Sequence, residues 1–169
     1  DGDPGRADAL AEDLADRLWA VRDVEAPPFP DADEAIDQAR SALLARTFGT
    51  VCMCDASDIV GAGAPGDNPR LLERLIARTA DLRTYFPFRD ADVVADLWDA
   101  PVGRRVDVEL GGKLDPAANA AIGVSARVLG RDEIGVTGKR VLLGVGKLSI
   151  VVCAGSPIAV KPSFYTSIG

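Results

Sequence analysis

The spacing of hydrophobic residues changes along the chain and divides it into a helical part and a β-rich part. Across residues 6–24, leucine and valine recur every three or four positions, which predicts an amphipathic helix. Three prolines end that helix, and Asp31 followed by Glu34 has the spacing of a capping box that begins a second one. Residues 1–47 are therefore expected to form two leading helices.

The middle of the chain, residues 48–100, contains a predicted strand, a glycine-rich loop and a helix in that order. The apolar run at 51–54 ends in Asp55, and residues 69–80 carry leucine and isoleucine on one helical face. A loop between a strand and a helix can bring backbone N–H groups close to a ligand. A further strand and a short helix are predicted at residues 83–88 and 91–99.

In residues 101–169 apolar and polar residues alternate in short runs, as is typical of strands. Gly146 and Lys147 separate two apolar runs in the manner of a hairpin turn. The fold class is therefore predicted as α/β (α+β), in a single domain of residues 1–169: two N-terminal helices, a strand–glycine-loop–helix unit and a mainly antiparallel β half. The strands predicted in the β half are 106–110, 122–129, 134–137, 141–145, 149–153 and 157–160, followed by a short terminal turn or helix.

Length and charge narrow the class of partners. The chain has 169 residues, enough for a real core, and no apolar run long enough to span a bilayer, so neither a membrane role nor a membrane partner is expected. A net charge of −7 argues against nucleic acid as a partner. The chain begins at Asp1 without an initiator Met or a signal-like segment, so it is expected to be a piece of a longer protein.

The three cysteines do not form a disulfide pattern. Cys52 and Cys54 would point to one face of the predicted strand, where small buried thiols are common, so we expect core packing rather than metal binding. The chain contains no histidine, and a pair of cysteines alone is a weak metal signal. A reducing compartment, and hence the cytoplasm, is the natural expectation.

The glycine-rich loop superficially fits a nucleotide-binding motif, because the glycines at 61, 63 and 66 have the G-x-G-x-x-G spacing. However, Asp58 and Asp67 bracket the loop and would repel a pyrophosphate, and Pro65 removes one N–H donor. Nucleotide binding is therefore the third hypothesis for this loop.

The candidate site residues are Asp55, Asp58, Gly61, Gly63, Pro65, Gly66 and Asp67, as lining of a substrate cleft or as loop contacts. Carboxylates beside a loop of this kind are found where α/β proteins place ligand contacts. The same carboxylates could instead bind the loop's own backbone N–H groups and begin the next helix, and the sequence leaves both interpretations open. Asp107, Glu109 and Asp115 are interpreted as solvated surface carboxylates.

The loop also carries a family resemblance. DASDIVGAGAPGD at residues 55–67 resembles the D-x-x-D-N-P-G-G-G-A-P-G-D signature in the C-terminal domain of the microcystinase C (MlrC) family of M81-type metallopeptidases. LGGK at 110–113, with Asp115 and Pro116 after it, and PSFYTSIG at 162–169 match in the same order. Ile59 and Val60 stand where the family has Asn and Pro, Ala62 replaces a glycine, and Pro69 replaces a threonine.

The resemblance implies a role in a zinc enzyme that hydrolyses peptide or amide bonds. It implies that the zinc ligands belong to an N-terminal domain, so this chain would hold no metal or other cofactor and would be inactive alone. The implied partners are that N-terminal metal-binding domain of the same parent protein and a peptide-like substrate, with this chain forming a wall of the cleft or a scaffold. No catalytic residue is assigned. The alternative is a non-catalytic structural or interaction module, which the departures in the loop favour.

Overall fold

The structure, a computed structural model of the chain, describes residues 2–25, 28–79, 81–114, 116–159 and 161–168. The chain forms two compact units, Asp1–Pro30 and Asp31–Gly169. No helix in the described part of the chain is long and apolar enough to cross a membrane.

The first unit is built on helix α1 (Pro4–Ala20), which confirms the first predicted helix. Asp3 caps the helix by accepting a hydrogen bond from the Gly5 N–H, and Pro4 occupies its first turn. The helix has no buried residue, and the predicted apolar stripe is exposed: Leu10, Leu14, Leu18 and Val21.

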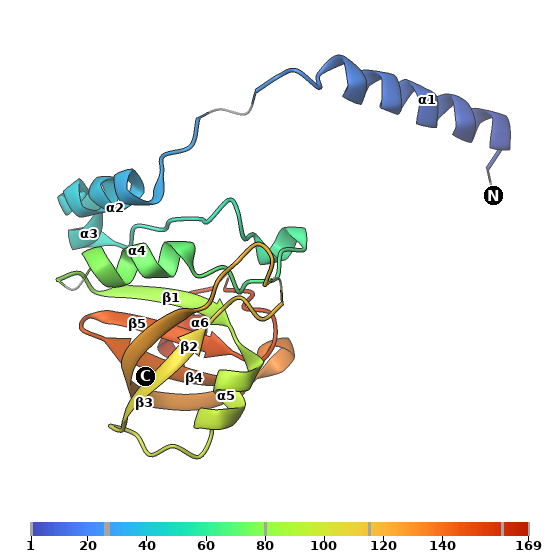
Figure 1. Cartoon of the computed structure of the whole chain (residues 1–169). Coiled ribbons are helices and arrows are strands. Elements are labelled where there is room, and N and C mark those ends of the chain that lie inside the picture. Colours follow the sequence, from blue (N-terminus) through green and yellow to red (C-terminus); the bar gives the residue numbers. More distant parts are fainter. Residues whose placement is uncertain (1, 26–27, 80, 115, 160, 169) are drawn as a thin grey trace. The chain divides into compact units, whose positions relative to one another are not determined.

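The second unit is centred on one five-stranded sheet in the order β1-β5-β4-β3-β2 (Figure 1). Strand β1 runs parallel to β5, and every other pair is antiparallel, so the predicted mixed fold with a mainly antiparallel β half is confirmed. The strands are β1 (Thr84–Arg89), β2 (Arg105–Leu110), β3 (Ile122–Ile134), β4 (Gly138–Val145) and β5 (Leu148–Cys153).

Strands β4 and β5 lie inside the sheet and are buried on both faces, which explains why their sequences are nearly continuous apolar runs. One face packs, together with α4 (Arg70–Arg78) and α5 (Ala91–Leu97), into the larger core. The other face packs against α6 (Ser163–Thr166) and the residues after it. Alternate residues divide accordingly: Val141, Leu143, Ile150 and Val152 face the larger core, and Leu142, Val151 and Cys153 face α6.

A fully buried arginine fastens the C-terminal segment to the sheet. Arg140 on β4 donates hydrogen bonds to the Asp132 carboxylate, to the Phe164 carbonyl and to Ser167 Oγ. Its guanidinium also lies 4.8 Å from the centroid of the Phe164 ring. The charge is therefore compensated inside the protein, as a buried charge must be.

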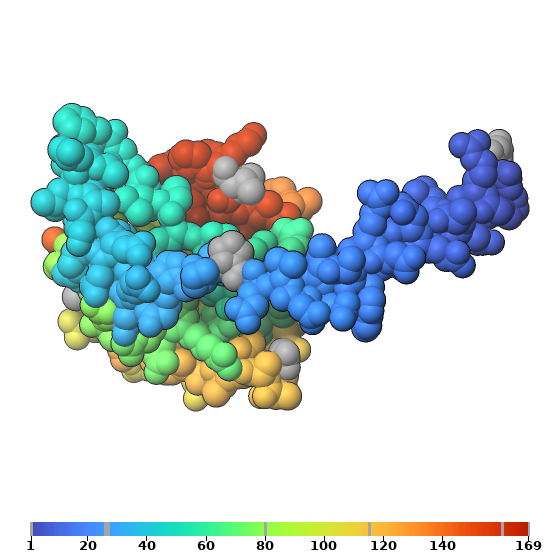
Figure 2. Space-filling view, turned by 90° about the horizontal axis from the view of Figure 1, so that it is seen from above, coloured from blue at the N-terminus to red at the C-terminus, as the bar shows by residue number. Residues whose placement is uncertain are grey.

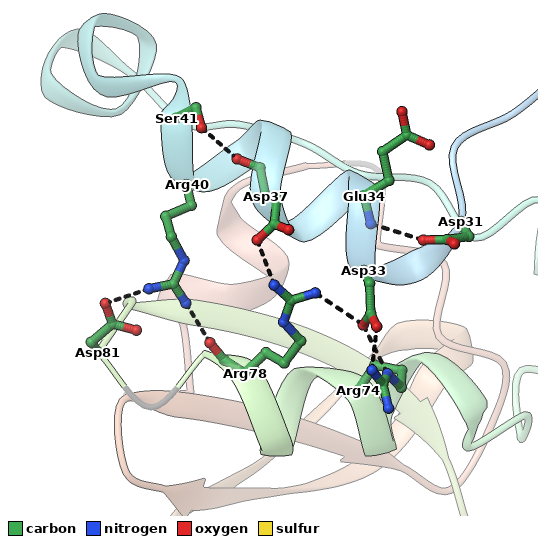
Figure 3. A network of polar contacts seen from close by, with 9 residues as sticks. All are labelled: Asp31, Asp33, Glu34, Asp37, Arg40, Ser41, Arg74, Arg78 and Asp81. Atoms are coloured by element: carbon green, nitrogen blue, oxygen red, sulfur yellow. Dashed lines mark hydrogen bonds and ion pairs between the residues drawn. The ribbon is translucent and has the colours of Figure 1, made fainter.

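The leading helix of the second unit, α2 (Ala32–Ser41), is held on α4. Asp31 accepts a hydrogen bond from the Glu34 N–H, as the capping-box spacing predicts, and Ile36 is buried in the core. Ion pairs of Arg74 and Arg78 with Asp33, of Arg78 with Asp37 and of Arg40 with Asp81 join the two layers (Figure 3). The hydrogen-bonded Arg74 guanidinium holds the pKa of Asp33 below its ordinary value. Because these pairs are exposed, the apolar contact of Ile36 carries most of the stabilisation.

Four predicted strands differ in detail from the structure. Residues 51–54 form no strand; they follow α3 (Leu43–Phe48) as an irregular segment, and Cys52 and Cys54 are exposed rather than packed in the core. The strands predicted at 122–129 and 134–137 are instead the single strand β3 followed by the 3₁₀ turn η2 (Gly135–Thr137), because a bulge at Val128 to Gly130 lets the strand continue through polar residues. Residues 157–159 are irregular, and position 160 lies outside the described residues.

Candidate functional site

The glycine-rich loop begins at Asp55, directly after the irregular segment 51–54. The Asp55 carboxylate accepts hydrogen bonds from the N–H and the hydroxyl of Ser57, at 2.9 and 2.6 Å. The chain then forms the 3₁₀ turn η1 (Val60–Ala62) and turns at Gly63, which has φ +98°. A left-handed φ of this size strains any residue with a Cβ, so glycine is needed at that turn.

Asp58 closes the loop on itself. One carboxylate oxygen accepts the Gly66 N–H at 2.8 Å, and the other accepts the Asn68 N–H at 3.0 Å. The expectation that Asp58 or Asp67 binds backbone N–H groups within the loop is confirmed for Asp58. Both Asp58 oxygens are therefore engaged in holding the loop.

Asp67 does not begin the following helix, which was one of the two roles that the sequence left open for it. Asn68 takes that place: its Oδ1 accepts the Arg70 N–H at 3.1 Å at the start of α4. Asp67 Oδ2 instead accepts the N–H of Leu114 at 2.9 Å. An aspartate next to a proline-initiated helix suggests a cap, and only the three-dimensional structure shows that its partner lies far away in sequence.

The surroundings of Asp67 tie the glycine-rich loop to the turn after β2. Asp67 is 1% exposed, and its carbonyl accepts the Gly112 N–H at 3.4 Å. Its Oδ1 is buried and has no hydrogen-bond partner within the described ranges. A buried carboxylate oxygen without a hydrogen-bond donor raises the free energy of the folded chain. A donor that reached Oδ1, besides the Leu114 N–H at Oδ2, would remove this cost.

The close approach of these two segments requires glycine at 111. Gly111 has φ +83°, and a Cβ there would lie 2.6 Å from the Asp67 carbonyl oxygen. Gly112 is restricted in the same way by the Asn119 carbonyl, at 2.5 Å from its ideal Cβ. The glycine-rich loop thus packs closely against the turn formed by the LGGK sequence.

A second buried carboxylate, Asp90, holds the other side of the same turn, and the sequence analysis did not identify it. Asp90 is 3% exposed and caps α5 by accepting the Val93 N–H at 3.1 Å. It also accepts the Gly111 N–H at 3.3 Å and the Lys113 ammonium at 2.6 Å. The sequence carries a signal for the cap, since an aspartate precedes the helical run at 91–99, but none for the contacts of Asp90 with the turn.

The candidate residues thus separate into a base and a tip. The base comprises Asp58, Pro65, Gly66 and Asp67, which are buried or half-buried; a Cβ on Gly66 would lie 2.9 Å from Val60 and 3.1 Å from Pro157. The tip comprises Gly61 and Gly63, which are exposed and have open space around them, with Asp55 half-exposed at the entrance of the loop. The tip is therefore the more exposed part of the loop.

Two hollows on the second unit are separate from the loop. One, of about 320 Å³, is lined by Glu73, Ile76, Ala121, Ile122 and Gly123. The other, of about 250 Å³, lies over Asp107, Glu109 and neighbouring residues of β2 and β3. Asp107 accepts a hydrogen bond from the Ser125 hydroxyl.

Within the described part of the chain, no group of three or more histidine, cysteine, aspartate and glutamate side chains could hold a metal ion. The chain has no histidine, and both oxygens of Asp58 and one oxygen of Asp67 already accept backbone N–H groups. The described residues therefore do not fit a zinc site.

The fold and the loop together define a domain of mixed α/β class in which buried aspartates hold two glycine-containing turns. The chain belongs to the family described as MlrC C-terminus, whose model matches residues 53–169, and this confirms the resemblance stated above. No protein with a curated description matches.

A solved structure has the same fold. It is the "Putative metallopeptidase" of Mesorhizobium sp. BNC1, with a TM-score of 0.76 and 22% sequence identity. The likeness covers 93% of this chain and 33% of that chain, so this chain spans about a third of the length of the protein that it matches.

Proposed function

We propose that this chain is the C-terminal, cleft-forming or scaffold domain of an MlrC-like zinc metallopeptidase that hydrolyses peptide or amide bonds. Membership of the MlrC C-terminus family and the shared fold with the Mesorhizobium protein support this proposal. Zinc would be held by an N-terminal domain of the same parent protein, because the described residues do not fit the metal. Alone, the chain would be inactive, and the parent would work in the cytoplasm on a peptide-like substrate.

The observation that carries the proposal is the contact between Asp67 and Leu114. It joins the base of the glycine-rich loop to the LGGK turn, and these are the two motifs of the family. That base presents the exposed tip at Gly61 and Gly63. We assign the tip to the cleft wall, where it would position substrate, and the base to support of the tip.

A non-catalytic module is the second candidate. It is supported by the engagement of Asp58 and of one Asp67 oxygen with backbone N–H groups, which leaves these carboxylates little capacity for chemistry. The departures at Ile59, Val60 and Ala62 from the family's loop support it as well.

A pair of matched variants in the full-length parent separates the candidates. Ala62→Trp adds bulk at the exposed tip, and Ala95→Trp adds the same bulk on the exposed face of α5. We expect Ala62→Trp to lower kcat/KM for peptide hydrolysis while Ala95→Trp leaves it unchanged, with similar melting temperatures for both. A parent that binds zinc and is unaffected by Ala62→Trp would rule out the tip as cleft wall, and a parent without zinc or hydrolysis would favour the module.

A further inference from the structure

Residues 50–54 have the composition of a strand and no strand partner. The run Thr-Val-Cys-Met-Cys is rich in residues that favour strands, yet the segment is irregular. None of its backbone N–H or carbonyl groups is hydrogen-bonded to another described residue. Cys52, Met53 and Cys54 are exposed. Local sequence preference and observed structure therefore disagree at this segment, and no strand among the described residues pairs with it.

Helix α3, which precedes this segment, also exposes apolar side chains. Helix α3 has no buried residue, and its three large apolar side chains are among the most exposed in the unit: Leu43 at 67%, Leu44 at 77% and Phe48 at 86%. Figure 2 shows this part of the chain, in cyan, on the surface. Together, α3 and residues 50–54 form an apolar strip, here called the docking strip.

The docking strip lacks the features by which proteins protect exposed strands. The strip carries one charged residue, Arg46 in α3, and residues 47–54 include no charged residue and no proline, although the chain as a whole is highly charged. Exposed apolar segments of this kind pair with other strands and cause aggregation unless they are covered. The composition therefore indicates a surface that is covered in the working protein.

We propose that the docking strip is covered by the N-terminal part of the same parent protein, and that residues 50–54 pair as a β-strand with a sheet of that part. The inference rests on the proposed function for the existence of that partner. The Mesorhizobium protein has the same fold over nearly all of this chain, and this chain accounts for a third of its length. A protein with twice as much additional polypeptide has the means to cover the strip, and main-chain pairing satisfies the free backbone groups.

Strand pairing at residues 50–54 would also position the glycine-rich loop. Asp55 follows the strip directly, and the loop tip at Gly61 and Gly63 lies a few residues further on. Pairing would place the tip at the boundary between the two parts of the parent. The docking strip therefore connects assembly of the parent to the geometry of the candidate site.

Native cysteines provide the test. Cys52 and Cys54 are exposed thiols in the strip, and Cys153 is fully buried and serves as an internal control. Labelling by iodoacetamide is followed by mass spectrometry in the 169-residue chain and in the full-length parent. We expect Cys52 and Cys54 to react about tenfold or more slowly in the parent, because reaction then requires local opening, while Cys153 is unreactive in both.

Amide hydrogen exchange on the same two proteins tests the pairing. We expect slow exchange at residues 51–54 in the parent and fast exchange in the isolated chain. Equal thiol labelling in both proteins would overturn the proposal, and protected thiols with freely exchanging amides would overturn the strand pairing. Protection of the isolated chain that grows with its concentration would assign the strip to a second copy and overturn the proposed occupant.

A variant separates this inference from the proposed enzymatic function. Met53→Asp should lower the melting temperature of the parent and leave that of the isolated chain unchanged, whereas Val136→Asp, at an exposed valine outside the strip, should change neither. An unchanged parent would contradict the inference. Zinc content and peptide hydrolysis of the unmodified parent test the proposed peptidase function separately. A protected docking strip in a parent without zinc would refute that function and support the covering of the strip.

Discussion

The carboxylate of Asp67 accepts the backbone N–H of Leu114 at 2.9 Å, across 47 residues of sequence. This contact joins the glycine-rich loop to the LGGK turn, and Asp90 holds the same turn from the other side through Gly111 and Lys113. The two buried aspartates thus fix the position of a turn that has no regular secondary structure of its own.

Asp67→Ala should destabilise the isolated chain by about 1–3 kcal/mol, since it removes the buried carboxylate that accepts the Leu114 N–H. Asp67→Asn should be milder, because its amide oxygen can still accept that N–H. Urea unfolding of both variants gives the free energies, with Glu109→Ala on the exposed face of β2 as the control. If Asp67→Ala unfolds at the same urea concentration as the control, the contact does not support the loop.

Gly111→Ala should destabilise the chain by about 1 kcal/mol or more, because the new Cβ meets the Asp67 carbonyl and the residue must keep φ +83°. Gly123→Ala is the matched control: an added Cβ there has no neighbour within 4 Å and its φ is ordinary. Thermal unfolding of both variants compares them directly. A larger loss for Gly123→Ala would contradict the close approach of the two turns.

Cys153 should make stability depend on pH in the alkaline range. Burial raises the pKa of this thiol to about 12. The folded state therefore holds the proton more tightly than the unfolded state, and the resulting stability is present below the unfolded pKa of about 8.5 and is lost as pH rises towards 12. Urea unfolding at pH 8 and pH 10 measures the fall in the free energy of unfolding.

Cys153→Ala should reduce that fall between pH 8 and pH 10, whereas Cys54→Ala, at an exposed thiol, should leave it unchanged. The pKa of Tyr165 is raised by burial first and then by Cys52 and Cys153, so the effect of Cys153→Ala includes the loss of its influence on Tyr165. Identical pH dependence in the wild type and Cys153→Ala would show that the thiol is not protonated preferentially in the folded state.

The isolated chain should purify without stoichiometric zinc and should not hydrolyse peptides, because it has no histidine and no group of metal-binding side chains in its described residues. Elemental analysis of the purified chain measures the zinc. One tightly bound zinc per chain would contradict the assignment of the metal to another part of the parent.

Local patterns in the sequence were sufficient wherever an element is stabilised by its own neighbours. The alternation around Val106 and Val108 predicted β2, and the turn at Gly146 predicted the hairpin of β4 and β5. The mistake at β3 has a specific cause: Gly130 and the polar residues after it resemble a turn, but a bulge keeps the strand intact and Asp132 pairs with buried Arg140.

The contacts of the candidate site could not be predicted in the same way. Asp58 binds groups within ten residues, so its role followed from the loop itself. Asp67 and Asp90 bind partners 47 and 23 residues away, and no local pattern identifies such partners. The strand predicted at 51–54 failed because strand preference is realised only where a partner strand exists.

Arg140 also has a consequence for the order of events during synthesis. Its strand is made before residues 161–168, which supply the Phe164 carbonyl and the Ser167 hydroxyl as its partners. Until those residues leave the ribosome, one face of β4 and β5 is bare and the guanidinium has only Asp132 to bind. The nascent sheet can thus be covered on its larger face first and remains exposed on the other until residues 161–168 are made, an interval in which a chaperone could bind its apolar surface.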